Sequence, residues 1–303
     1  DKLPKNKKVR KLVIRGYGVT EEGNSICIHI NGFEPYFFFK IPQDWDNKKF
    51  DEFKNNVLNM VDDNHRNSFV KAGIVKKKDF YGFANNKLFN FGIFVFKNQF
   101  AYNVFLKIFK EKIFTIQKWN ESFDFSNKLY ETKVSSLLRF FHVKNVDPSG
   151  WLKISGNKYT KNIPSLTRTQ IDISFNYNDI IKIAKNDVGK IIVASFDIEC
   201  TSEDGSFPKA TRKNDQIIQI GTTVYIFGES ECKYKYIATL NKCDPIDDVH
   251  VESFYTEKDL IIGWVKFIEK LDPDILTGYN IWGFDWSYIY KRAETGNGGL
   301  VSP

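Results

Sequence analysis

Cysteine, histidine and methionine are scarce in this 303-residue chain. The four cysteines lie far apart and form no Cys-x-x-Cys pair, which argues against a structural zinc site and a disulfide framework. The four histidines are dispersed and suggest neither zinc binding nor acid–base chemistry. No apolar run reaches 18 residues and no signal peptide opens the chain. We therefore expect a soluble, intracellular protein that is not secreted and has no membrane partner.

Phenylalanine, in contrast, is abundant, with 28 Phe and 14 Tyr against one Met. The hydrophobic content of 42% is ordinary for a globular protein, and the chain is long enough for two domains with cores of their own. We expect most of the phenylalanines at core positions.

Charge is distributed unevenly along the chain. Residues 1–190 carry 33 Lys and Arg against 19 Asp and Glu, a balance of +14, whereas residues 191–303 carry 11 against 18, a balance of −7. A basic region joined to an acidic one fits a polyanion-binding surface beside a metal-binding site, although a chance difference is the alternative. We place the domain boundary between residues 188 and 189, which gives domains 1–188 and 189–303.

Apolar runs and turn signals predict a mixed α/β chain. Thr256 is expected to cap a helix, with Asp259 near the position of a capping-box acid. The predicted strands cover 11–15, 25–30, 36–39, 69–83, 87–96, 191–198, 216–227 and 233–240, and the predicted helices cover 48–61, 100–115, 130–141, 257–270 and 285–294.

Two carboxylates follow an apolar run in the segment Ser195-Phe196-Asp197-Ile198-Glu199-Cys200. In a strand, residues i and i+2 share one face, so Asp197 and Glu199 are expected to point the same way. Neighbouring anions repel each other unless a cation lies between them, and hard oxygen ligands select Mg²⁺ or Mn²⁺. The alternative is an ordinary solvated strand at the edge of a sheet.

A third acid, Asp285, comes 88 residues after Asp197 at the start of a predicted helix. The positive end of the helix macrodipole favours an anion there, but helix capping alone also explains an aspartate at this position. The strand-strand-strand-helix pattern between the two stretches suggests an α/β nuclease core that brings the acids together.

These stretches resemble two motifs of the 3′–5′ proofreading exonuclease of family B DNA polymerases. Residues 196–200 resemble the Phe-Asp-Ile-Glu of motif I, and Asn280, Phe284 and Asp285 match the Asn-x-x-x-Phe-Asp of motif II. The resemblance is to the delta type and covers nearly the whole chain. It implies a basic mixed N-terminal domain followed by a partial RNase H-like 3′–5′ exonuclease domain. The stretches that carry the delta-type likeness are 18–25, 29–37 and 272–280.

The resemblance implies a site for two divalent metal ions, Mg²⁺ or Mn²⁺. It assigns Asp197 to both ions, Glu199 to the ion that activates water, and Asp285 to the other ion. It also implies single-stranded DNA with a 3′ end and a template strand as partners, together with the rest of a polymerase chain. A sliding clamp or an accessory factor is a further partner that fits the resemblance. The resemblance also implies that the protein acts at the site of DNA replication, in a nucleus or a viral compartment.

The same resemblance places Asn280 and Phe284 beside the 3′-terminal nucleotide and gives Phe207 a role as a wedge against bases, with packing on its own domain as the alternative. Lys76, Lys77 and Lys78 lie beside the aromatic run 80–83. Lysines with aromatic rings suit single-stranded nucleic acid, and the alternative is a solvated turn next to core aromatics.

One element of the family pattern is missing. Motif III, Tyr-x-x-x-Asp, supplies a fourth acid, but only 18 residues follow Asp285, and the polymerase motifs are absent as well. We therefore expect an N-terminal fragment of a DNA-directed DNA polymerase that ends inside the exonuclease domain and is nearly inactive by itself. The alternatives are a stand-alone DEDD-type exonuclease and a non-catalytic nucleic-acid-binding module.

Overall fold

The computed structural model describes residues 10–295, with side chains described up to residue 294. The chain groups into two compact units. Within the described residues, the first unit comprises 10–16, 27–168 and 172–185, and the second comprises 17–26, 169–171 and 186–295. The predicted domain boundary between residues 188 and 189 stays a prediction.

The first part of the chain is rich in short strands. Its strands are β1 (Ile14–Val19), β2 (Ser25–Asn31), β3 (Tyr36–Lys40), β4 (Phe69–Lys78), β5 (Leu88–Phe96), β6 (Ile113–Ile116), β7 (Glu121–Asp124), β8 (Leu129–Tyr130), β9 (Leu152–Ile154), β10 (Tyr159–Lys161), β11 (Ile171–Asn176) and β12 (Ile180–Lys182). Its helices are α1 (Asn47–Asn59), α2 (Asp63–Arg66), α3 (Gln99–Glu111) and α4 (Ser136–Lys144), with 3-10 turns at Gln117–Trp119 and Tyr177–Asp179.

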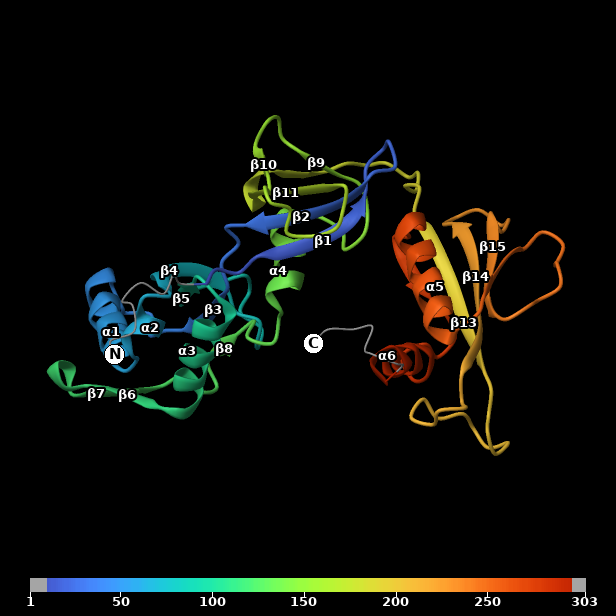
Figure 1. Ribbon diagram of the computed structural model, residues 1–303. Helices are drawn as coiled ribbons and strands as arrows, with labels where there is room; N and C mark the ends of the chain where they lie inside the picture. The colour runs from blue at the N-terminus through green and yellow to red at the C-terminus, as the bar shows by residue number, and fades with distance from the viewer. Residues whose placement is uncertain (1–9, 296–303) are drawn as a thin grey trace. The chain divides into compact units, whose positions relative to one another are not determined.

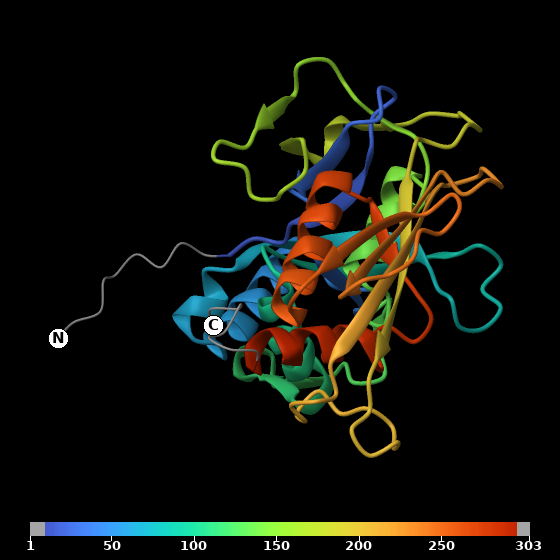
Figure 2. The same cartoon turned by 45° about the vertical axis from the view of Figure 1, so that its right-hand side comes forward.

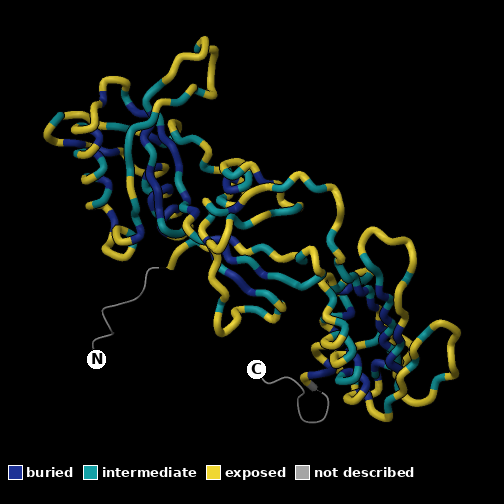
Figure 3. The backbone as a smooth tube through the Cα atoms, turned by 90° about the horizontal axis from the view of Figure 1, so that it is seen from above, coloured by how far each residue is buried: buried dark blue, intermediate teal, exposed yellow. Residues whose placement is uncertain are grey.

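The main core of the first unit lies between helices and a sheet of order β4-β5-β3-β8 (Figures 1 and 3). Its centre is built from aromatic rings, as the composition predicts, and Phe39 alone packs against six other phenylalanine rings. The Phe39 ring lies over Gly92 on the neighbouring strand, where a Cβ would collide with it. The glycine therefore makes room for the ring at the centre of the sheet.

The other sheets in this part of the chain are smaller. One has the order β1-β2-β11-β10, and two pairs, β12-β9 and β6-β7, complete the set. On β2 and β11, the buried side chain of His29 lies 3.0 Å from Asp172, measured from Nε2 to Oδ1. No local sequence pattern indicates this pair, because His29 and Asp172 are far apart along the chain.

The second unit contains a sheet of order β16-β15-β14-β13-β17, drawn in yellow to orange in Figure 1. Helix α5 lies against one face of this sheet, and α6 comes last along the chain (Figures 1 and 2). The elements are β13 (Ile192–Cys200), β14 (Ile217–Ile226), β15 (Tyr234–Leu240), β16 (His250–Phe254), α5 (Glu257–Leu271), β17 (Ile275–Thr277) and α6 (Asp285–Thr295).

Helix α5 has the ends that its sequence predicts. Thr256 caps it by accepting a hydrogen bond from the backbone N–H of Asp259 at 3.1 Å, which confirms the predicted cap. Asp272 ends it in the left-handed conformation, and Pro273 follows, where a helix cannot continue. The cap therefore fixes where the buried face of α5 begins.

The bounds of two predicted helices differ from those in the structure. The helix expected over 100–115 ends at Glu111, and the chain then enters a strand. The helix expected from residue 130 begins only at Ser136, because Glu131 has a positive φ and Ser135 supplies the helix cap.

No helix among residues 10–295 is both long and apolar enough to cross a membrane.

Candidate metal site and nucleic-acid contacts

Strand β13 lies inside its sheet, between β14 and β17. Along it Phe196 and Ile198 are buried, whereas Asp197 and Glu199 are exposed on the opposite face. The predicted alternation is therefore correct, and the alternative of an edge strand fails only up to Ser195, where β17 still pairs with β13. The buried face packs on α5, where the Phe196 ring lies 5.0 Å from the ring of Trp264.

The N-terminus of α6 brings the third acid to this strand. Pairing with the short strand β17 reaches only Ser195, and beyond it the backbone N–H of Ile198 donates a hydrogen bond of 3.2 Å to Oδ1 of Asp285. The carboxylate thus takes a position that a neighbouring strand would otherwise occupy. Asp285 also interacts with the carboxylate of Asp197. Two acids 88 residues apart in the sequence therefore meet.

The loop before α6 approaches β13 closely. A Cβ on Gly278 would collide with the backbone carbonyl oxygen of Phe196. Asn280 adopts a positive φ, and its carbonyl accepts hydrogen bonds from the N–H groups of Gly283 at 2.9 Å and Phe284 at 3.1 Å. This turn places Asp285 as the first residue of the helix.

Burial dominates the electrostatics of this pair. The pKa of Asp285 is raised, chiefly because only 2% of the residue is exposed, and the Asp197 carboxylate adds to the effect. The N–H of Ile198 works in the opposite direction. Burial also raises the pKa of the neighbouring Cys200 to about 12, so that this thiol stays protonated at neutral pH and is a poor nucleophile.

The donor set fits a hard divalent cation. Asp197 and Asp285 offer carboxylate oxygens, and a buried acid held against a second acid is the environment that a bound cation relieves. Glu199 lies on the same face of β13 as Asp197. Over residues 10–295, however, no group of three or more Asp, Glu, His or Cys side chains is placed to hold a metal ion. The structure therefore assembles two of the three predicted acids.

Exposed aromatic residues occur in the loop after β13 and in the segment before Asp285. The ring of Phe207 is 71% exposed and lies 5.0 Å from the ring of Phe284, a contact that agrees with packing on its own domain. Its role as a wedge against bases stays a prediction. Asn280 is exposed in the same segment. Tyr279 and Trp282 flank it with 92% and 84% exposure, and the sequence reasoning missed them as candidates. The signal in the sequence that could have found them is their position within six residues of Asp285.

The predicted basic residues lie in the first unit, near the end of β4. Lys76 and Lys78 are exposed and share a face of the strand. Lys77 points the other way, with its Nζ 3.9 Å from the ring centre of Phe38 and 3.8 Å from Oε1 of Glu131. Lys76 and Lys78 are therefore the two lysines that can face a polyanion.

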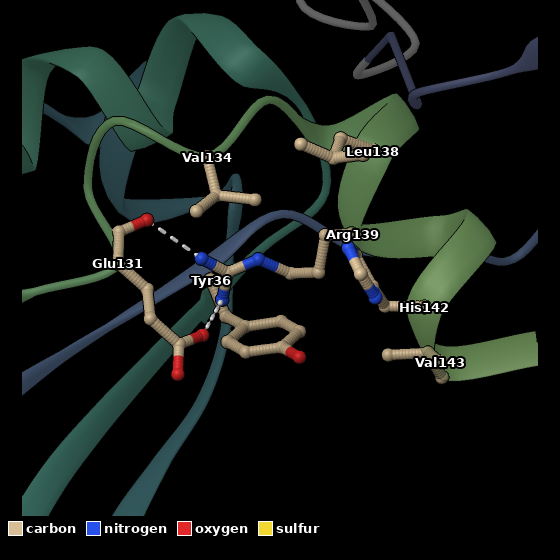
Figure 4. A pocket seen from close by; sticks show the side chains of 7 residues that line it. All are labelled: Tyr36, Glu131, Val134, Leu138, Arg139, His142 and Val143. Carbon is tan, nitrogen blue, oxygen red and sulfur yellow. Dashed lines mark hydrogen bonds and ion pairs between the residues drawn. The ribbon is translucent and has the colours of Figure 1, made fainter.

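A pocket of about 360 Å³ in the first unit offers no second site for a cation (Figure 4). Its one carboxylate, Glu131, forms an ion pair with Arg139 at 3.4 Å, and its backbone carbonyl accepts a hydrogen bond of 2.7 Å from the same guanidinium. Arg139 also lies over the ring of Tyr36 at 4.1 Å. The pair of acids on β13 and α6 remains the better candidate.

A buried ion pair holds α6 in place. Arg292 on α6 binds Glu257 at the start of α5, with Nε donating to Oε1 at 2.8 Å. The same guanidinium donates to the carbonyl oxygens of Ala210 and Arg212. Glu257 in turn accepts the backbone N–H of Ile217 at 2.8 Å. The helix that carries Asp285 is thus tied to the sheet and to the loop after β13.

Asp215 organises that loop and makes its stability depend on pH. Its buried carboxylate accepts N–H groups from Lys209 at 2.7 Å and Glu203 at 2.8 Å, which lower its pKa below the ordinary value of 3.8. Because the unfolded state takes up this proton first as pH falls, the stabilisation is present above about pH 4 and is lost as pH drops toward the lowered pKa.

We expect the free energy of unfolding to decrease below about pH 4, and less steeply in Asp215→Asn than in the unchanged chain. Urea unfolding followed at several values between pH 2.5 and 6 measures both slopes. Equal slopes in the two proteins would contradict the role given to Asp215.

Gly278→Ala is expected to destabilise the second unit by about 1–3 kcal/mol, because the atom that a Cβ meets belongs to the backbone of β13 and cannot turn aside. Thermal unfolding measures the loss. Gly221→Ala is the matched control, since Gly221 lies opposite Asp197 on β14 with open space at its Cβ position. An effect of equal size at both positions would show that close approach is not the cause.

Comparisons with known proteins identify the family of this chain. Over residues 127–299, more than half of the chain, the sequence matches the family described as DNA polymerase family B, exonuclease domain. It is 36% identical over 294 residues to a DNA polymerase of Acanthamoeba polyphaga mimivirus and 32% identical over 291 residues to the DNA polymerase delta catalytic subunit of Oryza sativa subsp. japonica. Both alignments cover 93% of this chain, but they cover only 17% and 26% of these relatives.

The fold has a counterpart among solved structures. The family B DNA polymerase from the hyperthermophilic archaeon Pyrobaculum calidifontis matches with a TM-score of 0.60 at 19% identity, over 93% of this chain and 30% of that one. The mixed α/β fold and the predicted resemblance are thereby confirmed. Since the family match covers more than half of its length, the chain belongs to DNA polymerase family B and contains residues of that family's exonuclease domain.

Proposed function

We propose that Asp197, Glu199 and Asp285 bind divalent metal, Mg²⁺ or Mn²⁺, in the 3′–5′ proofreading exonuclease of a replicative DNA polymerase. The observation that carries the proposal is the meeting of a buried Asp285 with Asp197 beside the N–H of Ile198. A two-metal site supplies a water nucleophile at neutral pH and stabilises the attacking and leaving oxygens of a phosphodiester displacement.

The fold contributes to this chemistry by holding the three carboxylates in fixed positions. Strand β13 fixes Asp197 and Glu199 on one face, and the hydrogen bond from Ile198 fixes the orientation of Asp285. Glu199 is the residue we assign to the side from which water attacks. Since the described residues assemble only two acids closely, we infer that this chain hydrolyses DNA slowly by itself.

The DNA contacts form part of the same proposal. Asn280 and the ring pair Phe207 and Phe284 are assigned to the 3′-terminal nucleotide, and the Lys76–Lys78 segment to the phosphates of a template strand. Exposure of Phe207, Asn280, Lys76 and Lys78 supports these roles. We further propose that residues 1–188 and 189–303 act as the N-terminal and exonuclease domains of a longer polymerase chain at the site of DNA replication, with a sliding clamp or accessory factor as a further partner.

A non-catalytic nucleic-acid-binding module is the second candidate, since exposed lysines and aromatic residues also fit it. It leaves Asp285 unexplained, because a buried carboxylate against another carboxylate costs stability without a cation. The exonuclease therefore accounts for more of the structure.

A nuclease assay tests the proposal. With protein in excess over 5′-labelled single-stranded DNA and Mn²⁺, we expect slow removal of nucleotides from the 3′ end, and none with EDTA or in Asp197→Ala. Cleavage that persists in Asp197→Ala, an internal cleavage pattern, or no cleavage at all would contradict it. Rapid digestion over many turnovers would contradict the expected weak activity of this chain.

A further inference from the structure

The turn between β4 and β5 exposes three aromatic rings within four residues. Phe80, Tyr81 and Phe83 are 87%, 72% and 96% exposed, and the sequence left open whether such rings would belong to the core. Water-exposed apolar groups that cluster in this way usually mark a binding surface. The alternative of core aromatics next to a solvated turn is therefore wrong for these three residues.

The charge of the segment 71–90, which contains the rings, is almost entirely positive. Lys76, Lys78 and Lys87 are exposed beside them, and Asp79 is the only acid between residues 71 and 90. Lys78 is held near the turn by a hydrogen bond of 2.8 Å from its Nζ to Oδ1 of Asn86. A partner of this surface must therefore be anionic and must offer flat apolar faces.

The one acid is used within the first unit. The Asp79 carboxylate binds the ammonium group of Lys40, accepts the O–H of Tyr130 at 3.0 Å, and accepts the N–H of Tyr81 at 3.1 Å. Burial and Asp79 together raise the pKa of Tyr130 to about 12, so its hydroxyl remains a donor at neutral pH. These bonds hold the base of the turn on β3 and β8 while the rings project into solvent.

We propose that the turn 79–87 is a base-stacking site for single-stranded nucleic acid, in which Phe80 and Phe83 stack on unpaired bases while Lys76 and Lys78 neutralise phosphates. Aromatic rings stack on every base without sequence preference, and lysines supply salt-dependent affinity for the backbone. Bases inside a duplex are already stacked, so the rings select a single strand. This site rests on the proposed DNA-binding function, but it needs neither metal nor Asp197.

The test compares two oligonucleotides of equal length and charge, one of oligo(dT) and one of abasic sites, by fluorescence anisotropy in EDTA. EDTA removes any metal-dependent binding at Asp197, Glu199 and Asp285. A failure of the base-stacking proposal in this test is therefore distinguishable from a failure of the nuclease proposal. We expect oligo(dT) to bind at least about fivefold more tightly than the abasic strand, because each stacked base contributes affinity. Equal affinity for both strands would overturn the proposal.

Variants separate the two parts of the site. Phe80→Ala/Phe83→Ala is expected to reduce oligo(dT) binding to the abasic level with the salt dependence unchanged. Lys76→Gln/Lys78→Gln is expected to weaken the binding of both strands and to lower the salt slope by about 1.4, which is about 0.7 for each of the two phosphates. Tyr255→Ala, at a residue 93% exposed in the second unit, is the matched control and is expected to bind as the unchanged chain does.

Either of two results would overturn the site. Oligo(dT) binding that is unchanged in Phe80→Ala/Phe83→Ala would show that the rings serve another partner, such as a protein segment. A loss of equal size in Tyr255→Ala would show that any exposed ring has the same effect. Because the substituted side chains are exposed, the variants are expected to keep the melting temperature of the unchanged chain.

Discussion

Replacing Glu257 by alanine is expected to lower the free energy of unfolding of the second unit by about 3–5 kcal/mol, because it leaves the Arg292 guanidinium buried without its counter-charge. Arg292 is only 8% exposed, and the ion pair links α5, α6 and the loop after β13. Removing Glu257 also takes the acceptor from the N–H of Ile217. Urea unfolding followed by circular dichroism measures the change.

Two further variants make this measurement specific. Lys258→Ala removes an exposed charge from the same helix and is expected to change stability by less than about 0.5 kcal/mol. In Glu257→Ala/Arg292→Ala the two losses are expected to be strongly non-additive, because neither charge then remains buried alone. Additive losses would contradict the coupling between the two side chains.

Asp197→Asn is expected to weaken Mn²⁺ binding by at least about 10-fold to 100-fold, the size of effect seen when support around a metal site is lost. The cause is the removal of one of the two carboxylates that the structure brings together. Calorimetric titration with Mn²⁺ measures the affinity. Asp244→Asn, at an exposed acid in the loop before β16, is the control and is expected to bind as the unchanged chain does.

Asp285→Asn tests the same metal site through the stability of the protein, measured with and without metal. Without a cation, the buried Asp285 carboxyl is held against Asp197 at a cost, so the asparagine variant is expected to be as stable as the unchanged chain or more stable. With saturating Mn²⁺ only the unchanged chain gains stability, because only it binds the ion tightly. A Mn²⁺-induced rise in melting temperature that is equal in both proteins would contradict this assignment.

The sequence predicted those parts of the site that depend on local periodicity. The common face of Asp197 and Glu199 follows from strand alternation, and the cap of α5 follows from Thr256 and Asp259. Both depend on residues within a few positions of each other. Such features need no knowledge of the tertiary fold.

The sequence predicted that Asp197 and Asp285 come together, but it did not predict the individual contacts between distant segments that achieve this. The hydrogen bond from Ile198 to Asp285 exists because β17 ends its pairing at Ser195, and no local pattern reveals where pairing stops. The bonds of Arg292 depend in the same way on the path of the loop around Ala210. Tertiary contacts, not local propensity, set these positions.

The turn 79–87 shows a different limit. The run of aromatic residues after three lysines fits both a core strand and a surface site, since periodicity does not fix burial at the end of a hairpin. The structure ends β4 at Lys78, and the bonds of Asp79 to Lys40 and Tyr130 turn the chain outward. The exposure of the rings follows from those two distant partners.

The central claim is that the acids on β13 and α6 hold a divalent metal ion. A crystal of this chain grown with Mn²⁺, and measured at a wavelength where manganese scatters anomalously, tests it directly. We predict an anomalous peak between Asp197 and Asp285, at about 2.0–2.2 Å from their carboxylate oxygens, that is absent from crystals of Asp197→Asn. A map without a peak there, or with manganese bound only at other acids, would contradict the claim.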